Sequence, residues 1–192
     1  MERRLVLSFC LFLSLYSLSQ DSVIYEVSGK IPKLKQEKSM DCWITVTTMM
    51  FSWKEDTVYS VNEFVKKIGS PWIEYYESNS GLTFDKQDDF IFQMGMKSEP
   101  PANYMLEAYI IFLKSHGPLW ITTGDGFSAH ARLLYSIVGD GSYDKSSFIF
   151  IDPASGNTVT QNAMSFFKEF EEEAIVANEE GWEQLRIQIY HF

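Results

Sequence analysis

The chemistry of this chain centres on Cys42, which lies in residues 36–53, QEKSMDCWITVTTMMFSW. Asp41 is a residue type favoured at helix N-caps and an apolar run follows it, so the sequence predicts a helix that begins at Cys42. A helix N-terminus carries about half a positive charge, which favours the thiolate, the reactive form of cysteine. The pattern therefore indicates a nucleophile at a helix start.

A nucleophilic cysteine needs a base, and the chain has three histidines. His116 follows a helical pattern, where a histidine commonly caps carbonyl groups, and His191, next to the C-terminus, is expected on the surface. His130 begins the strand pattern AHARLLYSIVG, which would hold its ring at a strand end facing a cleft. We therefore predict His130 as the base, with a purely structural histidine as the alternative.

The imidazole of His130 also needs a partner that orients it. Asp152 ends the strand pattern SFIFID, and a hairpin between the two strands would bring Asp152 near His130. The alternative is that Asp152 only starts the turn DPASG. The backbone N–H of Cys42 and the side-chain amide of Gln36 are candidate oxyanion donors, although Gln36 taken alone resembles an ordinary solvated glutamine.

The composition restricts the classes of function. The chain has 192 residues, 45% of them hydrophobic, which is enough for one well-buried domain. Its formal net charge of −10 argues against a nucleic-acid or anionic-membrane surface, because phosphates are bound by clustered Lys and Arg. The acidic residues show no metal-ligand spacing, so we expect no metal and a protein, peptide or glycan partner.

Residues 1–19, MERRLVLSFCLFLSLYSLS, have a short basic start, an apolar stretch and small residues at the end. This pattern is typical of a secretory signal peptide cleaved after Ser19, with an uncleaved anchor as the alternative. The exported chain would then keep Cys42 as its one cysteine, without an internal disulfide. We expect a periplasmic or secreted protein that meets a membrane only through this signal.

The elements that must position these residues fall into two groups. Ser60 and Glu63 form a capping-box pattern that opens a helix ending at Gly69. The helical patterns precede most of the strand patterns, which predicts an α+β fold. The other expected elements are an arm before residue 34, helices at about 83–94, 104–115 and 162–170, strands from Leu119, Ala131 and Ser147, an acidic loop at 171–181 and a strand at 185–192.

The order of Gln36, Cys42-Trp43, His130 and Asp152 resembles the papain-like cysteine peptidases. The segments GPLW, AHARLLYSIVGDG and IDPASG are similar to the compact bacterial branch that contains staphopain-like and plant-pathogen effector proteases, and to bacteriocin-processing peptidase domains. The resemblance spans residues 35–170. It implies a helical half with the nucleophile helix packed on a C-terminal twisted antiparallel sheet, and a cleft between them.

The same resemblance implies roles and partners. Cys42 would be the nucleophile, His130 the base, Asp152 the orienting residue and Gln36 the oxyanion donor, without a cofactor. The domains would be a signal peptide (1–19), an arm (20–33) and a peptidase domain (34–192), acting on protein or peptide. Residues 20–35 are too short for a folded inhibitory propeptide, so a separate inhibitor or immunity protein, narrow specificity or secretion itself would restrain a toxin or effector.

The sequence departs from the papain pattern at three places. Ser39 replaces a disulfide-forming cysteine, Asp152 replaces the usual asparagine, and Ile44-Thr45 replace small residues. Three other functions stay open: a peptidoglycan amidase, a deamidase or transglutaminase-like enzyme, and an inactive binding module. Trp43 and Ile44 disfavour the amidase, because amidases usually have serine and glycine after the nucleophile.

Overall fold

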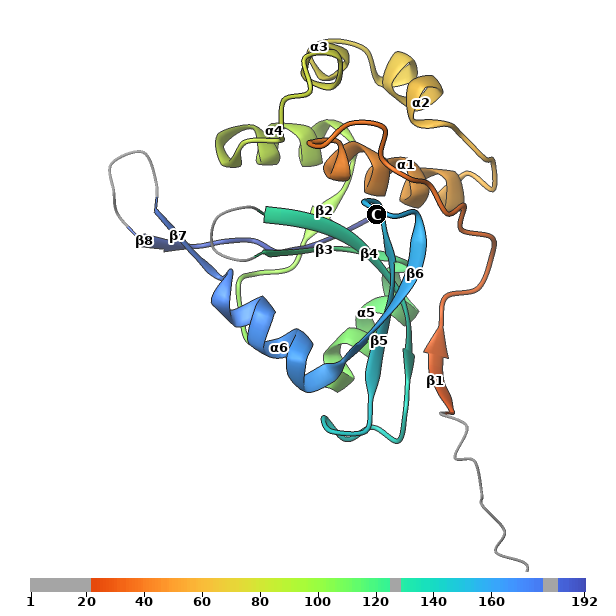
Figure 1. Cartoon of the computed structure of the whole chain (residues 1–192), viewed down its shortest axis with the longest axis vertical. Coiled ribbons are helices and arrows are strands. Elements are labelled where there is room, and N and C mark those ends of the chain that lie inside the picture. The colour runs from red at the N-terminus through yellow and green to blue at the C-terminus, as the bar shows by residue number, and fades with distance from the viewer. Residues whose placement is uncertain (1–21, 125–128, 178–182) are drawn as a thin grey trace, which may run out of the picture.

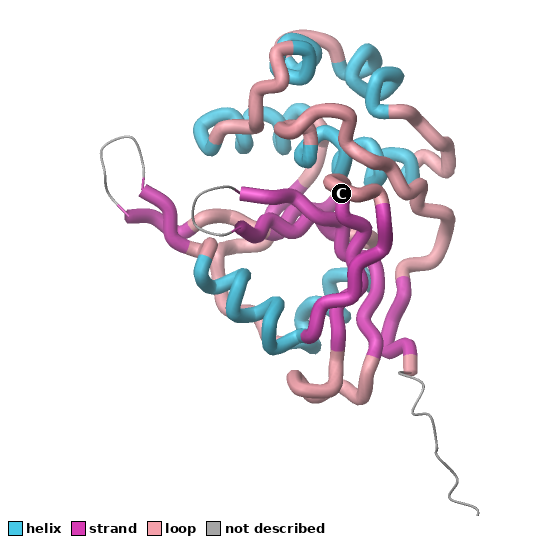
Figure 2. The backbone as a smooth tube through the Cα atoms, in the orientation of Figure 1, coloured by secondary structure: helices cyan, strands magenta, loops and turns pink. Residues whose placement is uncertain are grey.

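The computed structural model describes residues 22–124, 129–177 and 183–192. The expected signal peptide, residues 1–19, lies outside the described residues, as does the beginning of the expected arm. A seven-stranded antiparallel sheet forms the middle layer, with helices on both of its faces (Figures 1 and 2). The α+β prediction is confirmed.

The first layer consists of four helices at the top of Figure 1: α1 (Cys42–Lys54), α2 (Val61–Ile68), α3 (Trp72–Glu77) and α4 (Phe84–Gln93). The capping box of Ser60 and Glu63 is formed, and Gly69 ends α2. Helix α3 was not predicted, because its six residues WIEYYE are too few to show a helical period.

Helix α1 is buried on all sides, since every residue from Trp43 to Met50 is buried. Helix α1 lies between the sheet and the other helices and has no solvent face in its first half. The Thr47 and Thr48 hydroxyls donate to the Trp43 and Ile44 carbonyls at 2.8 and 2.7 Å. These bonds satisfy polar groups that would otherwise be costly to bury.

The main sheet has the strand order β2-β9-β3-β4-β5-β6, and the arm strand β1 pairs with β4. Neighbouring strands are antiparallel, as expected for the hairpin that carries His130 and Asp152. A separate ribbon joins β7 and β8. The strand bounds are β1 Val23–Glu26, β2 Lys97–Ser98, β3 Leu119–Gly124, β4 Ala129–Val138, β5 Ser147–Asp152, β6 Asn157–Asn162, β7 Ile175–Ala177, β8 Glu183–Leu185 and β9 Ile189–His191.

Two hydrophobic cores flank the sheet. One core lies between the sheet and the four helices α1, α2, α3 and α4, and it includes sheet residues such as Trp120 and Leu133. The other lies under the opposite face, where α5 (Leu106–His116) and α6 (Ala163–Glu172) cover residues such as Leu134 and Phe148. The second core is rich in aromatic edge-to-face pairs centred on Tyr109. The sheet is therefore held rigidly from both sides.

Helix α5 ends at His116, one residue after the prediction, and Gly117 follows with φ 78°. This backbone conformation favours glycine, and a Cβ on Gly117 would collide with the Trp53 ring. The α5 terminus is thereby packed against the C-terminal end of α1.

Three sequence predictions fail in the C-terminal region. Strand β6, NTVTQN, was missed because its polar residues lie on an exposed sheet edge. The expected strand 185–192 is interrupted, because the Gln188 side chain turns inward and donates to the Thr122 and Phe170 carbonyls. The acidic loop contains the end of α6 and strand β7.

Within the ranges that the structure describes, the helices are all too short or too polar to cross a lipid bilayer.

Candidate active site

Cys42 is the first residue of α1, so the prediction of a helix start at this position is confirmed. Asp41 occupies the N-cap position, but its side chain makes no capping bond. Its backbone (φ −92°, ψ 9°) is not extended, and the carboxylate accepts a hydrogen bond from the Lys38 N–H at 3.1 Å instead. As at every helix start, the first N–H groups of α1, including that of Cys42, have no carbonyl acceptor within the helix.

Asp41, directly before Cys42, is completely buried. Burial raises the pKa of Asp41 above its usual value, while the nearby Lys38 charge acts in the opposite direction. No sequence pattern indicates this burial, because an N-cap aspartate is normally solvated.

His130 and Asp152 meet as the hairpin prediction required. His130 lies near the start of β4, where it pairs with Thr123 of β3, and Asp152 ends β5. His130 Nε2 lies 2.8 Å from Asp152 Oδ1. A carboxylate can only accept, so Nε2 carries the proton and Nδ1 is the acceptor of the neutral ring.

The turn after β5 holds the Asp152 carboxylate. Oδ1 also accepts the Ala154 N–H at 2.9 Å, and the Gly156 N–H donates to the Asp152 carbonyl at 2.7 Å. Asp152 therefore starts the turn and also contacts His130, so it has more than the turn role that the alternative interpretation gave it. The turn fixes the carboxylate and the carboxylate orients the ring.

Cys42 and His130 line one cavity. Burial on its own would lower the pKa of His130, but hydrogen-bonding and charge interactions with Cys42 and Asp152 outweigh it and raise that pKa above the usual value. Since Asp152 occupies Nε2, Nδ1 is the ring nitrogen left for the Cys42 sulfur. The three side chains thus form one interacting group, with the His130 side chain 32% exposed.

Gln36 lies in the loop before α1 but is turned inward. Its amide nitrogen donates to the Lys38 and Ser39 carbonyls at 2.9 and 3.0 Å. Gln36 is not among the residues that line the cavity. The side-chain amide of Gln36 is therefore bonded within the loop that leads to Cys42. To contact an oxyanion, the amide would have to break its hydrogen bond to one of these two carbonyls.

The loop of Gln36 is joined to the turn of Asp152. The Gln36 N–H donates to the Pro153 carbonyl at 2.8 Å. Gly156 has φ 73°, and a Cβ there would press on the Lys35 backbone at 3.3 Å. The two segments, more than a hundred residues apart in the sequence, are thus held in fixed register.

The cavity measures about 350 Å³. Gly81, Leu82, Trp43 and Trp120 line this cavity, and both tryptophans are also buried in the core. The remaining lining residues were not foreseen, because nothing in their spacing links them to Cys42: Ser39, Met40, Thr83, Gln87, Thr122, Ala129, Ala131 and Arg186.

The cavity wall combines aromatic surface with a few polar groups. Trp43 packs edge-to-face on Phe90, with ring centroids 4.9 Å apart, and the Trp120 Nε1–H donates to Thr122 Oγ1 at 3.0 Å. Arg186 is paired with the buried Glu173, so its charge is already balanced at the cavity edge. Such a site offers apolar contact plus hydrogen bonds, which suits a peptide.

A family model described as "Papain-like cysteine protease AvrRpt2" matches residues 25–172 of the chain, which is well over half of its length. The matched segment contains Gln36, Cys42, His130 and Asp152. A search of curated proteins returned no match.

The raised pKa of His130 predicts a pH-dependent contribution to stability. The charged ring is favoured in the folded state, so the stabilisation is complete below the unfolded-state pKa of about 6.5 and is lost as pH rises through the higher folded-state pKa. Asp152→Ala should therefore lower the free energy of unfolding more near pH 6 than near pH 9, because the charged ring loses its partner only where it is charged. Urea denaturation of both proteins across this range measures the difference.

Asp140→Ala serves as the control, because Asp140 lies in the β4–β5 turn and accepts hydrogen bonds from Ser142 rather than from a histidine. Its effect should not change between these pH values. A stability loss in Asp152→Ala that is equal at both pH values, or larger at high pH, contradicts the prediction.

Proposed function

This chain belongs to the family of papain-like cysteine proteases represented by AvrRpt2, and from that premise we propose that Cys42, His130 and Asp152 form its catalytic triad. Membership of the family makes the protein a cysteine peptidase, a hydrolase acting on protein substrates. The observation that supports the triad is the 2.8 Å contact between His130 Nε2 and Asp152 Oδ1. His130 also lines the same cavity as Cys42.

The reaction follows from these positions. Asp152 holds the His130 ring so that Nδ1 takes the proton of the Cys42 thiol, and the resulting thiolate attacks the carbonyl carbon of the scissile amide. The C–N bond then breaks, His130 returns the proton to the leaving amine, and a thioester remains on Cys42. His130 next removes a proton from water, whose oxygen attacks the thioester carbon. The C–S bond breaks, the carboxylic acid is released, and His130 returns the proton to the Cys42 sulfur.

The negative oxygen of the intermediate requires donors. The Cys42 backbone N–H at the start of α1 is the first, because helix N-terminal N–H groups point outward and carry positive partial charge. We assign Gln36 as the second donor. Its amide would exchange one loop carbonyl, that of Lys38 or Ser39, for the oxyanion when substrate is bound.

The finer biological role is also part of this proposal. The family description and the pattern of residues 1–19 together support an exported bacterial protease that acts as a toxin or effector. Narrow substrate specificity of the protease, or a separate inhibitor or immunity protein, would restrain its activity. The polar and aromatic lining of the cavity supports selection among peptide side chains.

The triad predicts a specific order of activities. Cys42→Ala should reduce peptide hydrolysis at least about 10⁴-fold, because the nucleophile is lost. Asp152→Ala should cost roughly 10²–10⁴-fold, whereas Asp152→Asn should cost less, because its amide oxygen can still accept the Nε2–H of His130. Peptide-library digestion followed by mass spectrometry measures the rates and identifies the cleaved bonds.

The products separate the other functions. A deamidated or crosslinked but uncleaved chain indicates a deamidase or transglutaminase-like enzyme, and muropeptides released from sacculi indicate a peptidoglycan amidase. If Cys42 does not react with iodoacetamide below neutral pH and no substrate is turned over, the protein is the inactive binding module and the triad is contradicted.

The role of Gln36 is tested separately. Gln36→Ala should lower kcat by roughly 10²–10³-fold while leaving the rate of Cys42 alkylation by iodoacetamide unchanged, because alkylation forms no oxyanion. Gln161→Ala, on β6 and outside the cavity lining, is the matched control. Equal losses of kcat and of alkylation rate in Gln36→Ala show that Gln36 only shapes the loop and contradict the oxyanion assignment.

Export predicts a defined mature terminus. Expression of the full chain in a Gram-negative host, followed by N-terminal sequencing of the periplasmic or secreted protein, should give Gln20 as the first residue. A chain that retains residues 1–19 in the membrane or cytoplasmic fraction contradicts cleavage at Ser19.

A further inference from the structure

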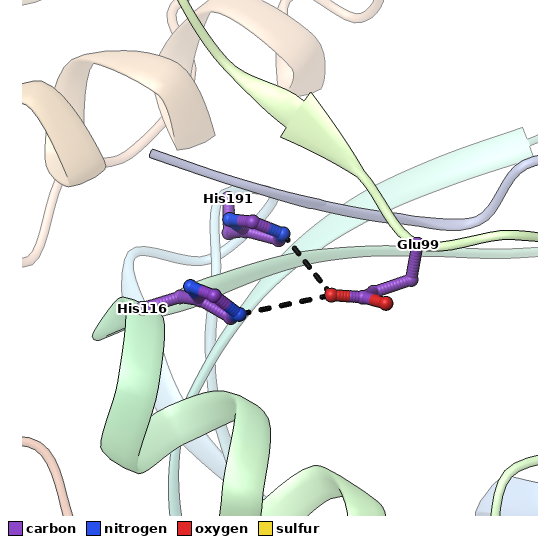
Figure 3. Close-up of side chains that lie close together, drawn as sticks. All are labelled: Glu99, His116 and His191. Atoms are coloured by element: carbon purple, nitrogen blue, oxygen red, sulfur yellow. Dashed lines mark hydrogen bonds and ion pairs between the residues drawn. The ribbon is translucent and has the colours of Figure 1, made fainter.

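A second group of chemistry-bearing side chains lies apart from the active-site cavity. Glu99 directly follows β2, His116 is the last residue of α5, and His191 is the last residue of β9. Figure 3 shows the two imidazole rings stacked, with both Nε2 edges directed at the Glu99 carboxylate. None of these residues lines the active-site cavity, and the peptidase reaction gives none of them a role.

The positions of the two histidines correct the sequence analysis. His191 was expected on the surface, but its side chain is only 4% exposed because β9 lies inside the sheet, between β2 and β3. His116 was interpreted as a helix cap, yet its Nε2 faces Glu99 rather than a carbonyl of α5. No sequence spacing relates these residues, since they come from three separate elements.

The donor atoms are close together. His191 Nε2 lies 3.1 Å and His116 Nε2 3.8 Å from Glu99 Oε1, and all three donors lie within 4.8 Å of one another. Zinc bonds nitrogen and carboxylate oxygen at about 2.0–2.2 Å, which puts tetrahedral ligands about 3.4 Å apart. The observed spacing is close to that requirement without any backbone movement.

The backbone that carries the donors is rigidly paired. Lys97 and Ser98 of β2 pair with His191 and Tyr190 of β9, and the Glu99 N–H donates to the Ile189 carbonyl at 3.0 Å. Gly117 fixes the end of α5 immediately after His116. Donors on a backbone that is already ordered lose little backbone conformational entropy when they bind an ion.

The chemistry of the set selects the ion. Two imidazoles and one carboxylate are the ligands of Zn²⁺ and other late divalent transition metals, whereas Mg²⁺ and Ca²⁺ take oxygen ligands. The His116 side chain is 31% exposed, so water can reach the group and complete the coordination. Lys97 acts electrostatically on His116 and opposes a cation, while the net charge of −10 favours one.

We propose that Glu99, His116 and His191 form a binding site for one Zn²⁺ ion. The rings are nearly parallel, 14° apart with centroids 3.8 Å apart, so both lone pairs cannot meet one ion without a tilt. The more exposed His116 ring tilts towards His191, and the metal takes the place of the hydrogen bond from His191 to Glu99. The ion then ties the C-terminal strand β9 to β2 and α5.

This connection reaches the peptidase domain through β9. Strand β9 pairs with β3 at Trp120 and Ile121, and the Gln188 carbonyl accepts the Thr122 N–H at 2.8 Å. Trp120 and Thr122 line the active-site cavity. A bound ion that holds β9 therefore stabilises one wall of that cavity, and it stabilises the fold because the unfolded chain lacks the site.

Binding is tested in full-length protein carrying Cys42→Ala, because a free thiol beside His130 is itself a metal ligand. Calorimetric titration with Zn²⁺ should give one bound equivalent and a raised Tm, and Co²⁺ should give the absorption bands of a tetrahedral site. Glu99→Gln and His116→Ala, each added to this background, should weaken binding at least tenfold. Circular dichroism checks that both variants are folded.

Two controls make the result decisive. Glu172→Gln alters a carboxylate on the surface of α6, and His130→Ala removes the remaining histidine; neither should change Zn²⁺ binding. Loss of binding in His130→Ala with retention in His116→Ala places the ion in the active site and overturns the proposal. Absence of Zn²⁺ binding in the folded Cys42→Ala protein also overturns it and leaves the three residues as a hydrogen-bonded cluster only.

Discussion

The packing of the buried helix α1 on strands β3 and β4 is the contact on which the rest of the structure depends. Cys42 begins that helix and His130 is the second residue of β4, so the proposed nucleophile and the proposed base meet only because the helix lies on this face of the sheet. Burial of nearly the whole helix gives a large apolar contact area, which stabilises the packing of α1 on the sheet. The cost of burying its threonines is offset by hydrogen bonds to the preceding turn.

A second constraint joins the segments on either side of the site. The loop before Cys42 and the turn after Asp152 are connected by the hydrogen bond from Gln36 N–H to the Pro153 carbonyl, and Gly156 allows the close approach of Lys35. The position of Asp152 therefore depends on the same backbone contacts that hold the loop before Cys42. Orientation of His130 and placement of Cys42 are coupled through rigid backbone rather than through long side chains.

The opposite face of the sheet contributes rigidity instead of chemistry. Helices α5 and α6 cover it with packed aromatic rings, and β9 is inserted between β2 and β3 near the C-terminus. That insertion brings Glu99, His116 and His191 together and links their geometry to the cavity wall through Trp120 and Thr122. One sheet thus carries the proposed catalytic residues and a separate cluster of side chains of metal-ligand type.

The sequence by itself determined the local features: the helix start at Cys42, the capping box of Ser60, the hairpin between the strands of His130 and Asp152, and the α+β class, because these depend on neighbouring residues and on periodicity. Only the tertiary structure decided the inward turn of Gln36, the burial of Asp41, most of the cavity lining and the meeting of Glu99 with His116 and His191. The cavity lining and the cluster of Glu99, His116 and His191 arise where segments distant in the chain pack together, and the loop of Gln36 is itself bound to distant Pro153 through its backbone. Such contacts leave no periodic pattern in the residues that make them.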